Sequence, residues 1–226
     1  FNDRYGMERL YVHRRGDTLY FSSEAKSILA VVPECRAFDE AGVAQYLRFG
    51  SVAAPSTLFR GVEVLGGATI IRRSPGSARQ EHRYFDPRDW EALPQLPPSA
   101  FVEELTCRLR ECVPIYAAAG RSAVGLSVTG GLDTRMILAA LPSPSSHLTC
   151  YTFTGTGGET FDESLGRRCA HECGLQHRSL GIGSDFFAEF DVFSDRAVLA
   201  SDGTAGATSA HEIYLTARAR RIAPIR

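Results

Sequence analysis

The sequence lacks several features that define whole classes of protein. Its 226 residues carry a net charge of -1, so no excess of positive charge is present to attract nucleic acid or an anionic membrane. No apolar run approaches the roughly 20 residues that a membrane-spanning helix needs, and no signal peptide is visible. We therefore expect neither a nucleic-acid nor a membrane partner. The hydrophobic content of 44% is ordinary for a globular protein.

Lysine and paired cysteines are also scarce. Lys26 is the only lysine, and arginine supplies the other 24 of the 25 basic side chains. The six cysteines include no Cys-x-x-Cys pair. On a helix His171 would point away from Cys169 and Cys173, so we interpret the cluster that they make with His177 as structural and not as a zinc site. Cysteines without a disulfide framework suit a reducing compartment, so we expect a cytoplasmic protein.

The most informative stretch that is present covers residues 126–135 and contains two adjacent glycines. It lies between an apolar run at 122–128, which is typical of a strand, and a run at 135–141, which is typical of a helix. A strand, a glycine-rich turn and a helix can form an anion-binding cradle, because the turn exposes N–H groups and the helix N-terminus adds partial positive charge. Asp133 is placed where it could hold Mg²⁺ on a phosphate chain. The stretch predicts a nucleotide-phosphate site.

This turn does not match two better-known nucleotide motifs. It has no lysine, which a Walker A loop requires, and it lacks the third glycine of the Rossmann fingerprint. It resembles the Ser-Gly-Gly-Xaa-Asp-Ser pyrophosphate loop (PP-loop) of ATP pyrophosphatases, with Thr129 and Thr134 in place of the two serines. Each replacement keeps a hydroxyl group. The alternative is an ordinary Gly-Gly turn in which Asp133 and Thr134 cap the following helix.

Motifs that precede the turn occur in the order of one family. Residues 2–11 resemble an Arg-Asp-Arg-Leu-Gly turn, and residues 19–29 contain Phe-Ser-Ser-Glu in place of Phe-Ala-Ser-Glu. Residues 57–62 read Thr-Leu-Phe-Arg-Gly-Val, similar to a Thr-Leu-Phe-Lys-Gly connector. Together with the PP-loop-like turn behind them, these motifs make nearly the whole chain similar to the asparagine synthetase family. No single motif is decisive, but their joint order is specific.

The resemblance implies an α/β protein with two parts. Residues 1–86 would be the C-terminal part of an α+β glutaminase domain of the Ntn-hydrolase type. Residues 87–98 would be a proline-rich linker, and residues 99–226 the first part of a parallel-sheet PP-loop domain, similar to the adenine nucleotide α-hydrolases. The chain would then be an internal piece of a longer enzyme, with the family's glutaminase cysteine upstream of Phe1. By itself we expect it to be inactive.

Local patterns in the first part predict strands and short helices. Apolar alternation on both sides of an Arg-Gly-Asp turn predicts a hairpin over residues 10–22. Asp39 is a candidate cap for a helix that ends at Phe49. Residues 67–73 are typical of a further strand.

Patterns in the second part alternate between helix and strand. Ser99 is expected to cap a long helix, and residues 160–173 form a second one with a capping box from Thr160 to Glu163. Strands are predicted at 122–128, 147–154 and 176–180. Such alternation implies a parallel sheet with right-handed crossovers.

In such a sheet, ligands bind beyond the carboxyl ends of the strands. Phe153 would pack against the adenine base or else be a plain core residue, and Asp162 matches an acid of the family or else complements the helix dipole. His177 is interpreted as structural. The resemblance assigns ATP and pyrophosphate binding to Ser127, Thr129, Gly130, Gly131, Leu132, Asp133, Thr134 and Phe153, with Asp162 as an additional acid and Asp133 as the metal ligand.

The function that the resemblance implies needs ATP and Mg²⁺. A carboxylate such as that of aspartate would attack the α-phosphorus of ATP, pyrophosphate would leave, and ammonia from glutamine would capture the acyl-adenylate. The enzyme would be a glutamine-hydrolysing carbon–nitrogen ligase, and a homodimer is compatible with it. Thr129, Thr134 and Arg135 depart from the family's loop, so two alternatives stay open: a β-lactam synthetase-like or peptide cyclase-like enzyme of the same fold, and a degenerate non-catalytic module.

Overall fold

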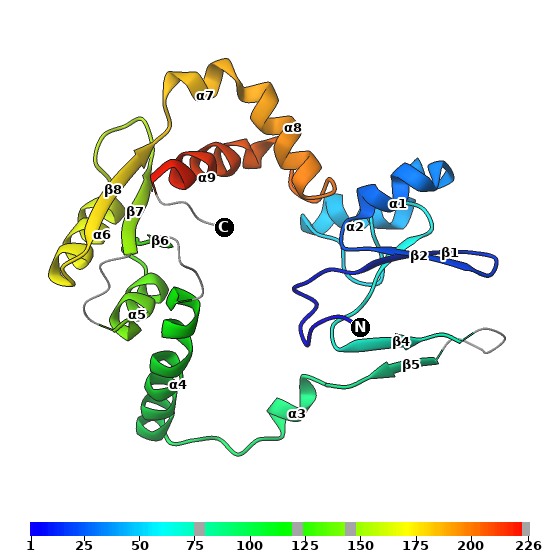
Figure 1. The fold of residues 1–226 in the computed structure, drawn as a ribbon, viewed down its shortest axis with the longest axis horizontal. Coiled ribbons are helices and arrows are strands. Elements are labelled where there is room, and N and C mark those ends of the chain that lie inside the picture. Colours follow the sequence, from blue (N-terminus) through cyan, green and yellow to red (C-terminus); the bar gives the residue numbers. More distant parts are fainter. Residues whose placement is uncertain (75–79, 119–123, 143–147, 223–226) are drawn as a thin grey trace. The chain divides into compact units, whose positions relative to one another are not determined.

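The structure is a computed structural model, and it describes residues 1–74, 80–118, 124–142 and 148–222. The chain divides into two compact units, which are described separately below (Figure 1). Unit 1 comprises residues 1–94 and 198–206, and unit 2 comprises residues 95–197 and 207–226.

Unit 1 contains a three-stranded antiparallel sheet, in the order β2-β1-β3, and a separate antiparallel pair, β4-β5. Its elements in chain order are β1 (Tyr11–Arg15), β2 (Thr18–Ser22), α1 (Ala25–Val31), η1 (Pro33–Arg36), α2 (Glu40–Phe49), β3 (Val62–Val64), β4 (Thr69–Arg72), β5 (Gln80–Arg83) and α3 (Arg88–Glu91). The core between α1 and the larger sheet is formed by Tyr11, Ala25, Ile28, Val32, Cys35 and Val62.

Several local predictions for this unit are confirmed. The hairpin forms, but Arg15 pairs with Thr18, so the turn contains only two residues, and Gly16 in it has φ 56°. Asp39 caps α2 by accepting a hydrogen bond of 2.8 Å from the Gly42 N–H group, and the helix ends at Phe49 as predicted. The strand expected at 67–73 is β4. The short helix α3 lies in the segment that the sequence suggested as a linker.

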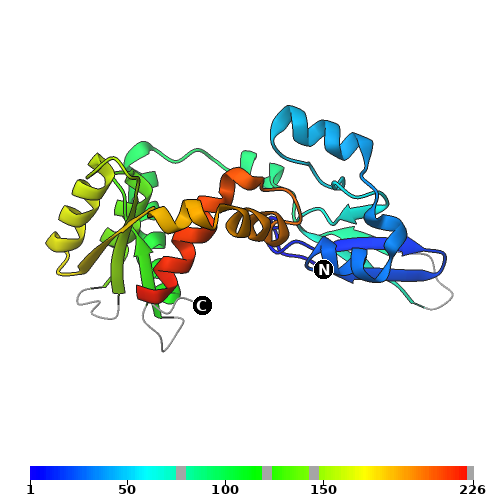
Figure 2. The same ribbon diagram turned by 90° about the horizontal axis from the view of Figure 1, so that it is seen from above.

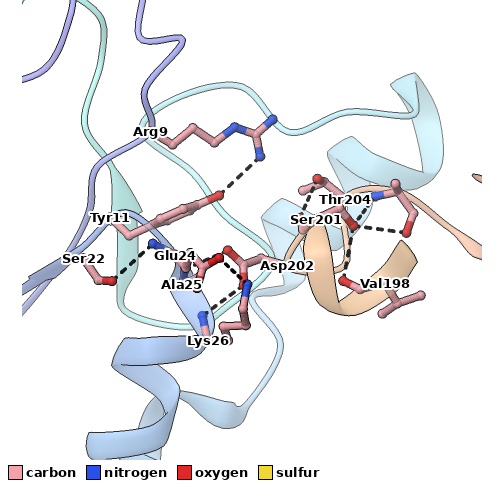
Figure 3. A network of polar contacts seen from close by, with 11 residues as sticks. Arg9, Tyr11, Ser22, Glu24, Ala25, Lys26, Val198, Ser201, Asp202 and Thr204 are labelled. Atoms are coloured by element: carbon pink, nitrogen blue, oxygen red, sulfur yellow. Dashed lines mark hydrogen bonds and ion pairs between the residues drawn. The ribbon is translucent and has the colours of Figure 1, made fainter. Parts of the chain in front are cut away.

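The start of α1 is capped by a residue that is distant in the sequence. Glu24 occupies the N-cap position, but its side chain caps no N–H group. Asp202 instead accepts hydrogen bonds from the N–H groups of Ala25 (2.8 Å) and Lys26 (3.1 Å), and it lies 3.5 Å from the Lys26 ammonium (Figure 3). From the sequence alone, segment 198–206 is expected in the second part of the chain. This remote cap explains why the segment belongs to unit 1.

Unit 2 is built on a parallel sheet in the order β6-β7-β8. Its elements are α4 (Pro98–Ala118), β6 (Val124–Ser127), α5 (Leu132–Ala140), β7 (Leu148–Thr154), α6 (Phe161–Glu172), β8 (Gln176–Gly181), α7 (Ser184–Ala188), α8 (Phe190–Ala200, of which the last three residues count with unit 1), η2 (Ala207–Ser209) and α9 (Ala210–Ile222). In the described part of the chain, no helix is both long and apolar enough to span a bilayer.

The sheet of unit 2 is covered on both faces. Cys150 of β7 packs with Ala170 of α6, whereas Phe153 packs against a cluster that includes Tyr214 of α9. Because neighbouring strand residues point to opposite faces, α6 and α9 lie on opposite sides of the sheet (Figures 1 and 2). This is the layered arrangement expected for alternating strands and helices.

The elements predicted for unit 2 are found, with differences at their ends. The strand predictions at 122–128, 147–154 and 176–180 correspond to β6, β7 and β8, although residues 122, 123 and 147 lie outside the described residues. Thr160 caps α6 as predicted, accepting a hydrogen bond from the Glu163 N–H group. Ser99 is not the cap of the long helix, because α4 already begins at Pro98, where the fixed φ of proline suits a first helical turn.

The remote cap leads to a first prediction. We expect Asp202→Gly to lower the free energy of unfolding by about 1–2 kcal/mol, since it removes the acceptors of two helix N–H groups. Glycine is chosen because Asp202 has φ 51°, which glycine adopts without strain. The measurement is denaturant unfolding, with Asp17→Gly in the exposed β1–β2 turn as the control.

Chemical labelling gives a second measurement of the same contact. Burial lowers the pKa of Lys26, but hydrogen bonds and charges from Glu24 and Asp202 outweigh burial, and the net pKa is raised. Since Lys26 is the only lysine, its acylation can be followed at a single site by mass spectrometry. Faster acylation is expected in Asp202→Gly, and a rate equal to that of the native protein would contradict the cap.

Candidate functional site

The Gly-Gly turn lies at the carboxyl end of β6. Because the three strands of unit 2 are parallel, β6, β7 and β8 end at the same edge of the sheet, which is where ligands bind in such folds. The next helix, α5, begins at Leu132 with Gly131 as its N-cap and without a side-chain cap. Asp133 and Thr134 lie inside α5, so the capping alternative for these two residues is wrong. The predicted order of strand, turn and helix is confirmed.

Two threonine hydroxyl groups hold the turn together. The Thr134 hydroxyl accepts a hydrogen bond of 3.2 Å from the Thr129 N–H group, and the Thr129 hydroxyl accepts one of 3.1 Å from the Gly131 N–H group. The two hydroxyl oxygens are 3.4 Å apart. Arg135 also contributes, because its Nε donates to the Gly131 carbonyl oxygen at 3.2 Å. Side chains of the predicted motif therefore fix the backbone of the motif.

The remaining N–H group of the turn is bound by a carboxylate. Gly130 donates a hydrogen bond of 2.9 Å to Oδ1 of Asp162, which lies in the first turn of α6. A Cβ atom at Gly130 would lie only 2.7 Å from this oxygen. Neither glycine of the turn has a left-handed backbone, since Gly131 has φ -64° and Gly130 is also outside that region. What requires glycine is the close approach of Asp162.

The structure thus brings together Thr129, Gly130, Gly131, Thr134 and Asp162. Asp133 is exposed in the first turn of α5, and Leu132 is also exposed. Through the Gly130 N–H group, the turn already donates a hydrogen bond to an anionic oxygen of the chain itself. The turn can therefore bind an anion with its backbone.

Two other predicted residues lie apart from these contacts. Phe153 packs against the core cluster that contains Leu180 and Tyr214, and its ring centroid is 5.2 Å from that of Tyr151. Phe153 therefore has the core position that was one of its two predicted roles. Its packing against an adenine base stays a prediction. Ser127 is half-buried at the end of β6, in register with Tyr151.

A buried network beneath the turn was not predicted. The Thr152 hydroxyl, 1% exposed, donates a hydrogen bond of 2.5 Å to the carbonyl oxygen of Val128, the residue directly before the turn. Its oxygen also lies 2.9 Å from Nε2 of His177. Since a hydroxyl carries one proton, Nε2 must be the donor of this second bond. Gly166 of α6 makes room for the network, because a Cβ atom there would lie 2.6 Å from the Val128 oxygen.

His177 has the structural role that was expected of it. Burial lowers its pKa, and the positive charge of Arg167 lowers it further, while Glu163 opposes the shift. The neutral ring is therefore the favoured form in the folded protein. The sequence shows a threonine in one predicted strand and a histidine in the next. It does not show that their side chains form a hydrogen bond with each other.

No metal-binding cluster is found among the residues that the structure describes, taking groups of three or more His, Cys, Asp or Glu side chains. Two cysteines of unit 2, Cys150 and Cys173, are poor nucleophiles because the pKa of each thiol is raised. Burial raises the pKa of Cys150 to about 11, with a smaller contribution from Cys173. Burial also raises the pKa of Cys173, and Cys169 adds to this.

The N-terminal motif folds as a compact turn around one carboxylate. Asp3 accepts hydrogen bonds from the N–H groups of Glu8 (2.7 Å), Tyr5 (2.9 Å) and Met7 (3.2 Å). These bonds, with that from Glu8 contributing most, hold the pKa of Asp3 below its usual value. The neighbouring Asn2 is buried and bonds to the backbone of residues 65, 66 and 69. The motif thus has a structural explanation in unit 1.

Comparison with known families agrees with this part of the chain. Residues 1–85 match the glutamine amidotransferase domain family, and no curated protein matches the chain. The first 85 residues are therefore similar to a glutamine amidotransferase domain, which supports the glutamine-dependent part of the resemblance. The parallel sheet and its Gly-Gly turn lie outside the match.

The geometry of the turn predicts unequal roles for its two glycines. Gly130→Ala is expected to cost about 1–3 kcal/mol of stability, because the new Cβ atom meets the Asp162 carboxylate and the Phe161 ring. Gly131→Ala should cost less, since its Cβ atom meets only the Thr129 hydroxyl, at 3.1 Å. Thermal or denaturant unfolding of both variants measures the difference. Equal losses would contradict the close approach of Asp162.

The buried histidine predicts a pH dependence. The pKa of His177 is lower in the folded protein than the ordinary value of about 6.5, so the unfolded state binds more protons as the pH falls through that value. This contribution to stability is fully present above about pH 6.5 and decreases below it. His177→Gln keeps a donor to Thr152 and should remove this part of the pH dependence. Replacement of the exposed His171 in His171→Gln should leave the pH dependence unchanged. Denaturation midpoints of both variants, measured above and below about pH 6.5, test the prediction.

Proposed function

We propose that the protein is an ATP-dependent amide-forming ligase of the asparagine synthetase type. It would activate a substrate carboxylate as an acyl-adenylate and use nitrogen from glutamine to form the amide. The observation that carries the proposal is the presence, on one chain, of a region similar to a glutamine amidotransferase domain and of a strand–Gly-Gly turn–helix with backbone donors for an anion. Amidation by glutamine needs both an ammonia source and an activated acyl group.

The residues of the turn are suited to a phosphate chain. The contact between the Asp162 carboxylate and the Gly130 N–H group supports anion binding at this place. Thr129 and Thr134 add hydroxyl groups, and the N-terminus of α5 adds a partial positive charge. On binding, a phosphate oxygen would replace Asp162 on the Gly130 N–H group.

Two carboxylates near the Gly-Gly turn are suitable ligands for a magnesium ion. Mg²⁺ in nucleotide sites is commonly held by one or two carboxylates together with phosphate oxygens. Asp133 lies in the first turn of the helix that follows the Gly-Gly turn, and Asp162 contacts that turn directly. When bound, the ion would supply positive charge that stabilises the departing pyrophosphate. Asp133 and Asp162 would hold it.

In the proposed reaction, the residues of the turn would orient the phosphates of ATP and stabilise the charge of the transition state. The turn would fix the phosphates so that the substrate carboxylate can attack the α-phosphorus in line. Donors that are already in place reduce the reorganisation needed as charge grows on the leaving group. The Thr152–Val128 bond would contribute indirectly, because it anchors the residue where the turn begins.

Replacement of Asp133 tests the proposal. Asp133→Asn is expected to lower ATP–pyrophosphate exchange about 100-fold, since a charged ligand of the phosphate-bound metal is lost. The melting temperature should stay the same, because Asp133 is exposed and no hydrogen bond of its side chain is found among the described residues. Exchange is measured with the whole protein, Mg²⁺ and candidate carboxylates such as aspartate.

A matched control is Asp195→Asn, an exposed acid on α8, which should retain native exchange. Exchange at the native rate in Asp133→Asn would contradict the metal role. Glutamate release that does not depend on ATP, without exchange in the native protein, would contradict the ligase itself and favour a protein that only hydrolyses glutamine.

A further inference from the structure

Unit 1 contains a pocket of about 390 Å³. One part of its wall is apolar and includes Leu58, Val64 and Leu65, and another part carries Arg9 and Tyr11. The size suits a small metabolite, and the wall, which is polar and apolar in about equal parts, can contact both a polar group and a hydrocarbon group. The residues that form the pocket all belong to unit 1, and none belongs to the Gly-Gly turn.

Two hydrogen-bond donors in this pocket have capacity that the described protein does not use. Tyr11 is only 5% exposed, and its hydroxyl oxygen accepts a hydrogen bond of 3.3 Å from Nη1 of Arg9 (Figure 3). Within the described residues, no acceptor is found for the hydroxyl proton of Tyr11, and no carboxylate pairs with Arg9. Arg9 is exposed, so its unused N–H groups are solvated, and an incoming carboxylate would replace that water with a charge-assisted hydrogen bond.

The donors select an anion. A guanidinium group has five N–H donors in a planar fork that matches a carboxylate, and the adjacent phenol can donate to the same group. A negative charge in the pocket wall disfavours ligands that carry more than one negative charge. Asp202 also lines the pocket, and its carboxylate is already bound to the N-terminus of α1 and to Lys26. A single negative charge is therefore favoured over the two charges of a phosphate group.

We propose that this pocket binds a small monocarboxylate. Its carboxylate would accept hydrogen bonds from the Tyr11 hydroxyl and the Arg9 guanidinium, and its hydrocarbon part would contact Leu58 and Val64. The inference goes beyond the proposed ligase reaction, because the pocket lies in the unit that does not contain the Gly-Gly turn. It assigns a binding function to Arg9 and Tyr11, which no catalytic argument uses.

Fluorine NMR of the whole protein labelled with 3-fluorotyrosine can test this site. The chain has eight tyrosines, and the resonance missing from Tyr11→Phe identifies Tyr11. Butyrate is the probe, since it combines a carboxylate with a hydrocarbon chain that can reach the apolar wall. We expect a saturable shift of the Tyr11 resonance with a dissociation constant in the millimolar range, and weaker binding of inorganic phosphate.

Two arginine variants distinguish butyrate binding in the pocket from a general effect of removing a positive charge. Arg9→Gln should weaken butyrate binding about tenfold, since a charge-assisted bond is lost. Arg14→Gln removes an exposed arginine of β1 that does not line the pocket, and it should bind butyrate as the native protein does. The melting temperature, raised by butyrate in the native protein and not in Arg9→Gln, provides a second measurement.

Three results would overturn the proposal: no saturable shift of the Tyr11 resonance, equal binding by native protein and a folded Arg9→Gln, or tighter binding of phosphate than of butyrate. The measurement records binding at Tyr11 and not turnover. Its failure is therefore separate from a failure of ATP–pyrophosphate exchange, which tests the Gly-Gly turn.

Discussion

The position of the Gly-Gly turn depends on the hydroxyl group of Thr152. It donates to the carbonyl oxygen of Val128, accepts from His177, and is sheltered by α6, which approaches closely because residue 166 is glycine. A buried polar group without partners is costly, so the Thr152 hydroxyl, the Val128 carbonyl group and the His177 ring must stay together once the sheet has formed. β7, α6 and β8 thereby fix Val128, the residue between the end of β6 and the Gly-Gly turn.

The need of buried or helix-terminal polar groups for hydrogen-bond partners also explains why unit 1 is formed by two separate segments of the chain. The first N–H groups of α1 need acceptors, and Glu24 at the N-cap position does not supply one. Asp202 does so from a turn 177 residues beyond Ala25. The chain therefore passes from unit 1 to unit 2, returns for residues 198–206, and passes to unit 2 again. In the proposed ligase, the unit that includes the amidotransferase-like residues 1–85 would also contain a segment that follows the Gly-Gly turn in the sequence.

Local chemistry accounts for the elements that were predicted correctly. Asp39 and Thr160 cap their helices with their own side chains, and the bonds span three residues, so a pattern in the sequence is enough to reveal them. The hairpin at Gly16 is similarly local. The prediction for Ser99 failed because Pro98 can itself start a helix, and both residues are acceptable first positions on local grounds.

Short-range periodicity and motif order are enough to predict the order of strand, turn and helix around Gly130, the parallel α/β class of unit 2 and the similarity of the first residues to an amidotransferase domain. Four other contacts depend on the packing of distant elements: Asp162 with Gly130, Thr152 with Val128, Phe153 with Leu180 and Tyr214, and Asp202 with the start of α1. Each of these contacts joins residues more than 20 positions apart. Local patterns do not encode which distant partner a buried polar group finds, since that depends on how strands and helices pack.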